Sequence, residues 1–388
     1  MADLVIQRRR DVPQSNTGPV RYALQMARGN ERILAMRETL IAFSELCGQP
    51  GTMDDLSYFL SKPGLLTRIP CLFLVVKRPN LKLEELGVDD LIGALFLYEY
   101  SVMGCGIRAF ATNDRSGRGT MLALPEQRLR VASIASRVLM DRGAHIVMLS
   151  FRLAGEETDK EDIQGLNVLP SSRMKADWAW RERQIAAYLP LEDSYEGTLA
   201  KLGKKTRINM RYYRKRAEAQ LGCRFIPEVM LTPEDFVQFN RECMYRVSDR
   251  IALWRLKTMQ DLRDPLLMGM KDGDGRWLAL LGGRRYRDRT EVLWQVNRDG
   301  YPTHSLSSVM RSYCIEHEVE RGMKRLYFEG GTAHSIHHAF VREELVDLVA
   351  VRRSPVAWVM KKVAVRRVSP DNELADVLKD PETVWLPC

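Results

Sequence analysis

Short apolar segments separated by polar turns set the strongest limit on how this chain can fold. The longest uninterrupted apolar run is Ile69–Val76, and it contains Pro70. A helix that crosses a membrane needs about 20 apolar residues, so we expect no membrane span. The pattern instead predicts a protein built from many short strands with helices between them.

The order of these segments indicates the fold class. In the second half, strand patterns over 277–286 and 291–297 precede a helical pattern over 304–321, and a strand pattern over 325–329 follows. In the first half, a helical pattern over 125–142 also lies between strand patterns. Strands and helices mixed in this order predict an α/β or α+β fold.

The chain is long enough for two domains, since domains commonly have about 100–200 residues and this chain has 388. The stretch 154–187 is polar and charged, as in a linker. We therefore expect an N-terminal domain over 1–180 and a C-terminal domain over 181–388. Residues 1–50 predict a basic, polar lead and then a helix, and 345–351 predicts the last strand of the second domain.

Cysteine use and the N-terminus both indicate a cytoplasmic protein. The seven cysteines are scattered and form no CxxC pair, so neither a disulfide framework nor a zinc site is expected. The first residues, MADLVIQRRRDVPQ, lack the apolar core of a signal peptide. The net charge of +9 suits a polyanionic partner, whether nucleic acid, an anionic membrane or a phosphate-bearing cofactor.

Much of this charge lies in one helical segment. Between Lys201 and Arg216 there are eight cations and no acid. Three of the cations share one helical face: Arg207, Arg211 and Arg214. One interpretation is a solvated amphipathic helix whose core-facing residues are Leu202, Ile208 and Tyr212. The other is a binding site for cofactor phosphates, a tRNA acceptor stem or an acidic substrate, with Lys205, Arg207 and Arg211 as the binding residues.

The turn before the helical pattern at 304–321 has features of a phosphate site. It reads Tyr301-Pro-Thr-His-Ser-Leu-Ser-Ser308 and leads into a helix that begins near Ser305. A helix start offers unpaired N–H groups and a partial positive charge, which suit a phosphate. The same residues also fit an ordinary helix start in which Thr303 or Ser305 is the N-cap. The two interpretations are compatible.

A second candidate phosphate loop lies in the first half, over Arg115-Ser-Gly-Arg-Gly-Thr120. Its glycines permit close approach of the backbone to a ligand, and its arginines supply charge. Pro125 separates the loop from the helix that follows, which favours a flexible loop over a phosphate site.

Candidate proton-transfer groups gather near the end of the second half, where five of the six histidines lie between 304 and 338. Amide formation needs a base for the proton of the attacking amine. His304 and Glu329 are the candidate bases, and Tyr301 is a candidate acid for the leaving group. His334 and His338 share one helical face and are candidate substrate-binding residues. Without an HExxH pattern or a third ligand, we expect no metal.

Three segments of the second half, in order, resemble the acetyltransferase-like domain of the GNAT superfamily in double-domain Fem-type transferases and related biosynthetic acyltransferases. They are Leu199–Gly222 (LAKLGKKTRINMRYYRKRAEAQLG), Val292–Arg321 (VLWQVNRDGYPTHSLSSVMRSYCIEHEVER) and Leu326–Gly331 (LYFEGG). The strand pattern LIGALFLYEY, over 91–100, resembles the GalPL strand of the partner domain, with Phe96 where proline is usual. The family's Tyr-Lys pair after the last strand is replaced here by 331–338.

The resemblance implies two tandem GNAT-like domains, each with a mixed, mostly antiparallel sheet flanked by helices. It implies direct transfer of an acyl group from acyl-CoA, or another acyl thioester, to the amine of a small molecule or peptide. In such enzymes, main-chain groups of one strand bind the donor's pantetheine arm, and the next helix start binds its pyrophosphate. The matching strand residues are Trp294, Gln295 and Val296. The matching helix-start residues are Ser305, Leu306, Ser307 and Ser308.

Two alternatives keep the same fold. One is a Fem-like transferase whose donor is aminoacyl-tRNA and whose product is a peptide or amide bond; the basic segment favours it. The other is a non-catalytic protein that binds nucleic acid on a degenerate transferase fold. The aromatic content near the basic segment, Tyr212 and Tyr213, is small for a surface that stacks bases.

Overall fold

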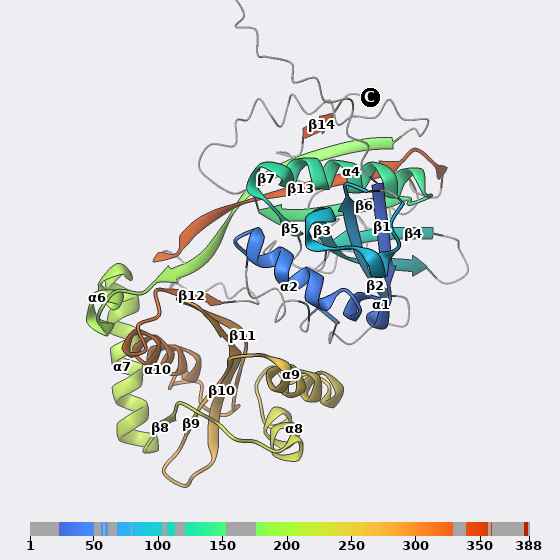
Figure 1. The fold of residues 1–388 in the computed structure, drawn as a ribbon. Coiled ribbons are helices and arrows are strands. Elements are labelled where there is room, and N and C mark those ends of the chain that lie inside the picture. The colour runs from blue at the N-terminus through green and yellow to red at the C-terminus, as the bar shows by residue number, and fades with distance from the viewer. Residues whose placement is uncertain are drawn as a thin grey trace, which may run out of the picture.

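The protein forms one continuous sheet of 14 strands, with helices packed against it along its length (Figure 1). This computed structural model describes residues 23–49, 56, 59–60, 68–78, 80–102, 107–112, 121–152, 176–328, 339–355, 358 and 384–386. The strands are β1 (Ala23–Arg28), β2 (Arg68–Val76), β3 (Leu91–Val102), β4 (Ile107–Thr112), β5 (Met121–Ala123), β6 (Ile146–Arg152), β7 (Ala176–Pro190), β8 (Arg224–Ile226), β9 (Pro265–Lys271), β10 (Trp277–Tyr286), β11 (Arg289–Asn297), β12 (Arg325–Phe328), β13 (Val341–Arg352) and β14 (Val384–Leu386).

The helices are α1 (Asn30–Leu34), α2 (Arg37–Leu46), α4 (Arg128–Asp141), α6 (Tyr195–Lys201), α7 (Lys204–Leu221), α8 (Pro233–Arg241), α9 (Asp249–Asp261) and α10 (Leu306–Glu320). Three short 3-10 helices are η1 (Leu83–Glu85), η2 (Val88–Asp90) and η3 (Pro125–Gln127). No described helix is both long enough and apolar enough to span a bilayer.

The sheet is mostly antiparallel, and each of its two parallel pairs is connected by a helix. β4 pairs with β6 across α4, and β11 pairs with β12 across α10. The strand order is β1-β2-β3-β4-β6-β13-β7-β12-β11-β10-β9-β8, with β5 beside β3 and β14 beside β7. The expected fold class, a mixed α/β fold with mostly antiparallel strands flanked by helices, is confirmed.

β7 and β13 connect the two halves of the molecule (Figure 1). Trp178 and Trp180 of β7 pack in the core of the first half, whereas Leu189 of the same strand packs in the core of the second. β13 returns from the second half to pair with β6 over 345–351. The boundary expected at 180/181 therefore falls inside one strand. The strand expected to finish the second domain completes the sheet of the first.

Three local expectations are corrected by the structure. Residues 176–187, expected in a linker, belong to β7, and Trp178, Ala179 and Trp180 in its first part are buried. The expected polar lead contains β1. The single helix expected after the lead is two helices, α1 and α2. The basic segment is divided between two helices at Gly203, because α6 ends at Lys201 and α7 begins at Lys204.

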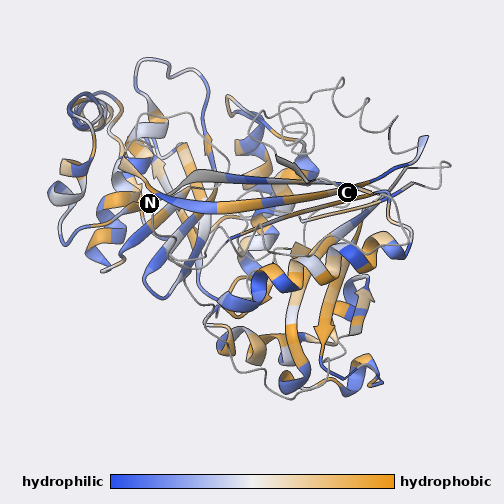
Figure 2. Cartoon of the chain, turned by 90° about the horizontal axis from the view of Figure 1, so that it is seen from above, coloured by the Kyte–Doolittle hydropathy of each residue, from blue (hydrophilic) through white to orange (hydrophobic). Residues whose placement is uncertain are grey.

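The apolar residues follow the layers of the fold. Figure 2 shows hydrophobic residues concentrated along the strands and hydrophilic residues on much of the helix surface. α10 is the exception, because it is buried along most of its length between the sheet and α7. Its N-terminus is therefore held in place by packing on two sides.

We predict that a methyl group at Gly283 destabilises the second half. Gly283 of β10 lies against the main-chain carbonyl of Glu291, and a Cβ would collide with that oxygen. Gly283→Ala should therefore lower the stability by about 1–3 kcal/mol, seen as a lower thermal midpoint in calorimetry. Gly273→Ala is the matched control, because its added Cβ would lie 3.6 Å from the nearest atom. Equal midpoints for the two variants would contradict the prediction.

Candidate functional site

β11 carries a β-bulge next to the point where its described pairing with β12 ends. The parallel pairing of the two strands covers four residue pairs and ends at Val292 and Phe328. On its other edge, β11 pairs with β10, and the register shifts by one residue at Leu293. A bulge bends and twists the strand that carries it. No strand of the described chain pairs with β11 after Val292 on the β12 side.

The main chain of Gln295 faces this open edge. The N–H of Arg298 donates to the carbonyl of Leu278 on β10, at 2.8 Å. The main-chain N–H and C=O of Asn297 therefore face away from β10, and the carbonyl accepts from the N–H of Met244, at 3.1 Å. Main-chain groups alternate between the two edges of a strand. Gln295, two residues before Asn297, thus directs its N–H and C=O into the gap between β11 and β12.

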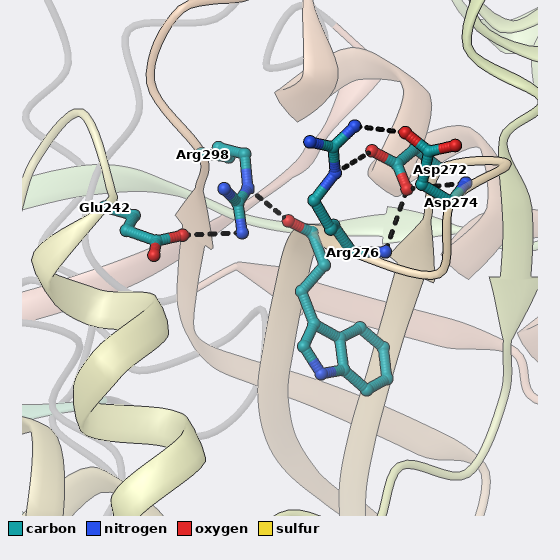
Figure 3. Close-up of polar contacts among 6 residues, drawn as sticks. Glu242, Asp272, Asp274, Arg276 and Arg298 are labelled. Atoms are coloured by element: carbon teal, nitrogen blue, oxygen red, sulfur yellow. Dashed lines mark hydrogen bonds and ion pairs between the residues drawn. The ribbon is translucent and has the colours of Figure 1, made fainter.

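Arg298 fixes the far end of this gap. Its Nε donates to the carbonyl of Trp277 at 2.6 Å, and its Nη2 lies 2.6 Å from Glu242 (Figure 3). In the neighbouring turn between β9 and β10, Arg276 is ion-paired with Asp272 at 3.1 Å. The segment after α8 is therefore attached to the end of β11 and frames the gap on the side opposite Phe328.

The first turn of α10 leaves main-chain amides available. Ser305 is the N-cap and is left-handed, with φ 48° and ψ 53°, which is uncommon for a residue other than glycine. Its side chain does not cap the helix; it donates instead to the Ser308 hydroxyl, at 2.9 Å. The amides of Leu306 and Ser307 make no hydrogen bond within the described chain. They are suitable donors for an anionic oxygen.

Several predicted binding residues have buried side chains, so that only their main chain could meet a ligand. Trp294 and Val296 are buried in the cluster that packs under α8 and α9. Leu306 is buried in the core between α10 and the sheet, and Ser308 is 5% exposed. Among the helix-start residues, only Ser305 and Ser307 are partly exposed.

Arg311 was not predicted from the sequence, yet it lies at this gap. It is 3% exposed, its Nε is 3.3 Å from Oε1 of Gln295, and its guanidinium lies over the ring of Phe328 at 5.2 Å. Burial lowers the pKa of Arg311 to about 10. The available signal in the sequence was a single basic residue within 306–315, whose other residues are uncharged.

Tyr301 and His304 lie on the side of the turn that faces α7. His304 Nε2 is 3.1 Å from Oε1 of Gln220, and the Tyr301 ring lies 6.1 Å from the His304 ring. Burial, and then the charge of Arg216, lower the pKa of His304 below its ordinary value. These contacts lead toward the end of α7 rather than to the open edge of β11. Three other predicted residues lie outside the described residues: Glu329, His334 and His338.

The basic segment is α7, and its arginines meet neighbours on the protein. Arg214 lies 2.7 Å from Glu316 of α10, Arg211 is ion-paired with Glu196, and Arg207 donates to the carbonyl of Ala200 at 3.3 Å. Lys205 is exposed, and the described residues provide it with no ion pair. The expectation that Ile208 and Tyr212 face the core is wrong, because they are 53% and 54% exposed. α7 instead contacts α10 through the face that carries Arg214.

The first half has the same parallel strand pair, but its gap is closed. Beyond the pairing of β4 with β6, the Thr112 hydroxyl accepts from the N–H of Ser150 at 2.9 Å. At the start of α4, Arg128 donates to the carbonyl of Arg152 at 3.1 Å. The candidate loop Arg115–Thr120 lies outside the described residues. Side chains thus bond the main chain of β6 beside and beyond this parallel pair.

No protein-family model and no curated protein matches the sequence. Similar solved structures include a tandem GNAT protein from the clavulanic acid biosynthesis pathway, with 10% identity over 86% of this chain and 99% of that one and a TM-score of 0.47. L-PGS from Bacillus licheniformis is 11% identical over 83% and 94% of the two chains, with a TM-score of 0.47. FemX is 9% identical over 75% and 94%, with a TM-score of 0.43.

We predict that His304 protonates below its ordinary pKa of 6.5 and that Arg216 contributes to this shift. A nearby cation disfavours the imidazolium, so Arg216→Ala should raise the pKa toward the ordinary value, although burial still lowers it. An NMR pH titration of the His304 ring resonances, assigned with His304→Gln, measures the effect. Lys215→Ala, one residue away on α7, is the control and should leave the titration unchanged. An unchanged midpoint in Arg216→Ala would show that its charge does not act on His304.

Proposed function

We propose that this protein is an N-acyltransferase that moves an acyl group from an acyl thioester of coenzyme A to an amine. The open edge of β11 at Gln295 is the observation that carries the proposal. An extended arm with amide groups, such as pantetheine, can pair with the main-chain N–H and C=O there as a short strand would. The start of α10 then lies where the anionic end of the same donor can bind.

The donor site is assigned to the second half. In the first half, the Thr112 hydroxyl accepts from the N–H of Ser150 on β6, and Arg128 of α4 donates to the carbonyl of Arg152 at the end of β6. Side chains thus bond the main chain of β6 beside and beyond the parallel pair. In the second half, no described group bonds the main chain of Gln295 on β11 or the amides of Leu306 and Ser307.

The reaction would be a direct attack of the amine nitrogen on the thioester carbonyl. The new C–N bond forms, the C–S bond breaks, and the thiol of coenzyme A leaves. A main-chain N–H on the open edge of β11 stabilises the oxyanion. The amine proton passes to a base, with His304 and Glu329 as candidates. The lowered pKa of His304 keeps its imidazole neutral, as a base requires.

The test is binding and turnover with acyl-CoAs of different chain lengths. We expect acetyl-CoA or a longer acyl-CoA to raise the thermal midpoint and to release thiol when an accepted amine is added. Ser307→Glu should weaken donor binding at least about tenfold, because a carboxylate at the helix start repels the donor phosphates. Ser307→Gln is the matched control, since it adds similar bulk without charge, and should bind much more tightly.

Two results would decide against this assignment. If no acyl-CoA binds or releases thiol, the proposed donor is wrong. If Arg118→Glu, in the first-half loop, removes binding while Ser307→Glu does not, the donor binds in the first half instead.

A second candidate donor is aminoacyl-tRNA, and the exposed face of α7 favours it. Lys204, Lys205 and Lys215 are exposed on this helix, and the described residues offer them no ion pair. Such a face suits a phosphate backbone. Activity that needs charged tRNA and is lost after RNase treatment would support this donor. RNA binding without turnover of any donor would instead support a non-catalytic role.

A further inference from the structure

We propose that Arg311 is a positioning residue for the acyl donor, because it holds Gln295 and thereby ties the open edge of β11 to the start of α10. The inference rests on the proposed function. Arg311 lies on α10, Gln295 on β11, and Phe328 at the end of β12. The contacts of Arg311 with these two strands place its guanidinium where the described pairing of β11 with β12 ends.

The side-chain amide of Gln295 has its orientation set by its neighbours. Its Nε2 donates to Oδ1 of Asn297 at 2.9 Å and to the carbonyl of Ser307 at 3.3 Å. Its Oε1 accepts from Nε of Arg311 at 3.3 Å. An amide oxygen cannot donate and a guanidinium cannot accept, so a flipped amide would lose all three bonds. Arg311 is therefore the group that holds the oxygen of this amide, while Asn297 and Ser307 hold its nitrogen.

One amide thus links the two parts of the proposed donor site. Through the Ser307 carbonyl, Gln295 is bonded to the first turn of α10, whose amides would bind the anionic end of the donor. Its own main chain faces the gap that would receive the extended arm. A shift of the Gln295 side-chain amide would move the open edge of β11 and the start of α10 relative to each other. A displacement of about 1 Å is enough to reduce catalysis strongly.

The surroundings of Arg311 also argue for a specific role. A buried guanidinium is expensive to desolvate, and an apolar residue of similar size commonly fits a core at least as well. The run 306–315 of α10 contains no other charged residue. Its neighbour Ser312, which is fully buried, bonds instead to Tyr195 of α6, away from the gap.

The experiment is a double-mutant cycle with acetyl-CoA as the probe. Arg311→Met and Gln295→Met should each weaken binding by about tenfold, because each removes a hydrogen bond to a charged group. The double variant should bind no more weakly than the worse single variant, since Arg311 is proposed to act through Gln295. Arg311→Lys keeps the charge without the planar group, so it should also bind weakly. Ser312→Ala is the control and should bind like the parent.

Two further readouts separate positioning from general damage to the fold. KM for the donor should rise in the Arg311 variants, whereas KM for the amine should not change. Hydrogen exchange of the amides of 305–308, measured without ligand, should be faster in Arg311→Met and unchanged in Ser312→Ala. This exchange measurement needs no donor, so it also serves for a variant that is folded but inactive.

The outcomes distinguish this inference from the proposed function. Tight binding of acetyl-CoA by the parent and by both Arg311 variants overturns the positioning role alone. Additive losses in the cycle, or an equal loss in Ser312→Ala, also overturn it. If the parent binds no acyl-CoA, the proposed function fails, and unchanged exchange at 305–308 in Arg311→Met would then overturn the tie between Gln295 and α10 as well.

Discussion

The end of the pairing between β11 and β12 is the constraint on which the candidate site depends. Past Val292 and Phe328, the N–H and C=O of Gln295 have no strand beside them in the described chain. Unpaired main-chain groups inside a protein need water or a ligand as partner. The gap therefore favours a ligand that is extended and has polar groups along its length. The start of α10 lies beside it because α10 is the connection between these two strands.

The position of β12 depends in turn on the first half. β12 pairs with the last residues of β7, and β7 is paired along its length with β13. Asp347 of β13 is fully buried, and it binds Arg181 of β7 at 2.7 Å and Ser150 of β6 at 2.6 Å. Removing one partner of such a buried pair leaves an uncompensated charge, which is strongly destabilising. One wall of the gap in the second half is thus held in place by a polar network in the first.

The sequence allowed the fold class and most elements of the second half to be predicted, because their apolar spacing is regular. The start of α10 was predicted to within one residue from the turn at 301–308. β7 was missed because the charged residues 181–183 follow its tryptophans, in a stretch whose overall polarity resembles a linker. Arg311 was missed because helical spacing does not show which residue of a helix lies opposite a gap between strands. The exposure of Ile208 and Tyr212 depends on which face of α7 meets α10, and spacing alone did not decide between the faces.

The two halves share one local topology and differ in how its main-chain groups are satisfied. Each has a parallel strand pair joined by a helix, and in each the described pairing covers only a few residues. In the first half, the Thr112 hydroxyl satisfies the amide of Ser150, so that gap needs no outside partner. In the second half, no described side chain takes the amides of Leu306 and Ser307. The halves therefore differ in whether a described side chain satisfies the main chain beside the parallel pair, and this difference is why the donor site is proposed in the second half.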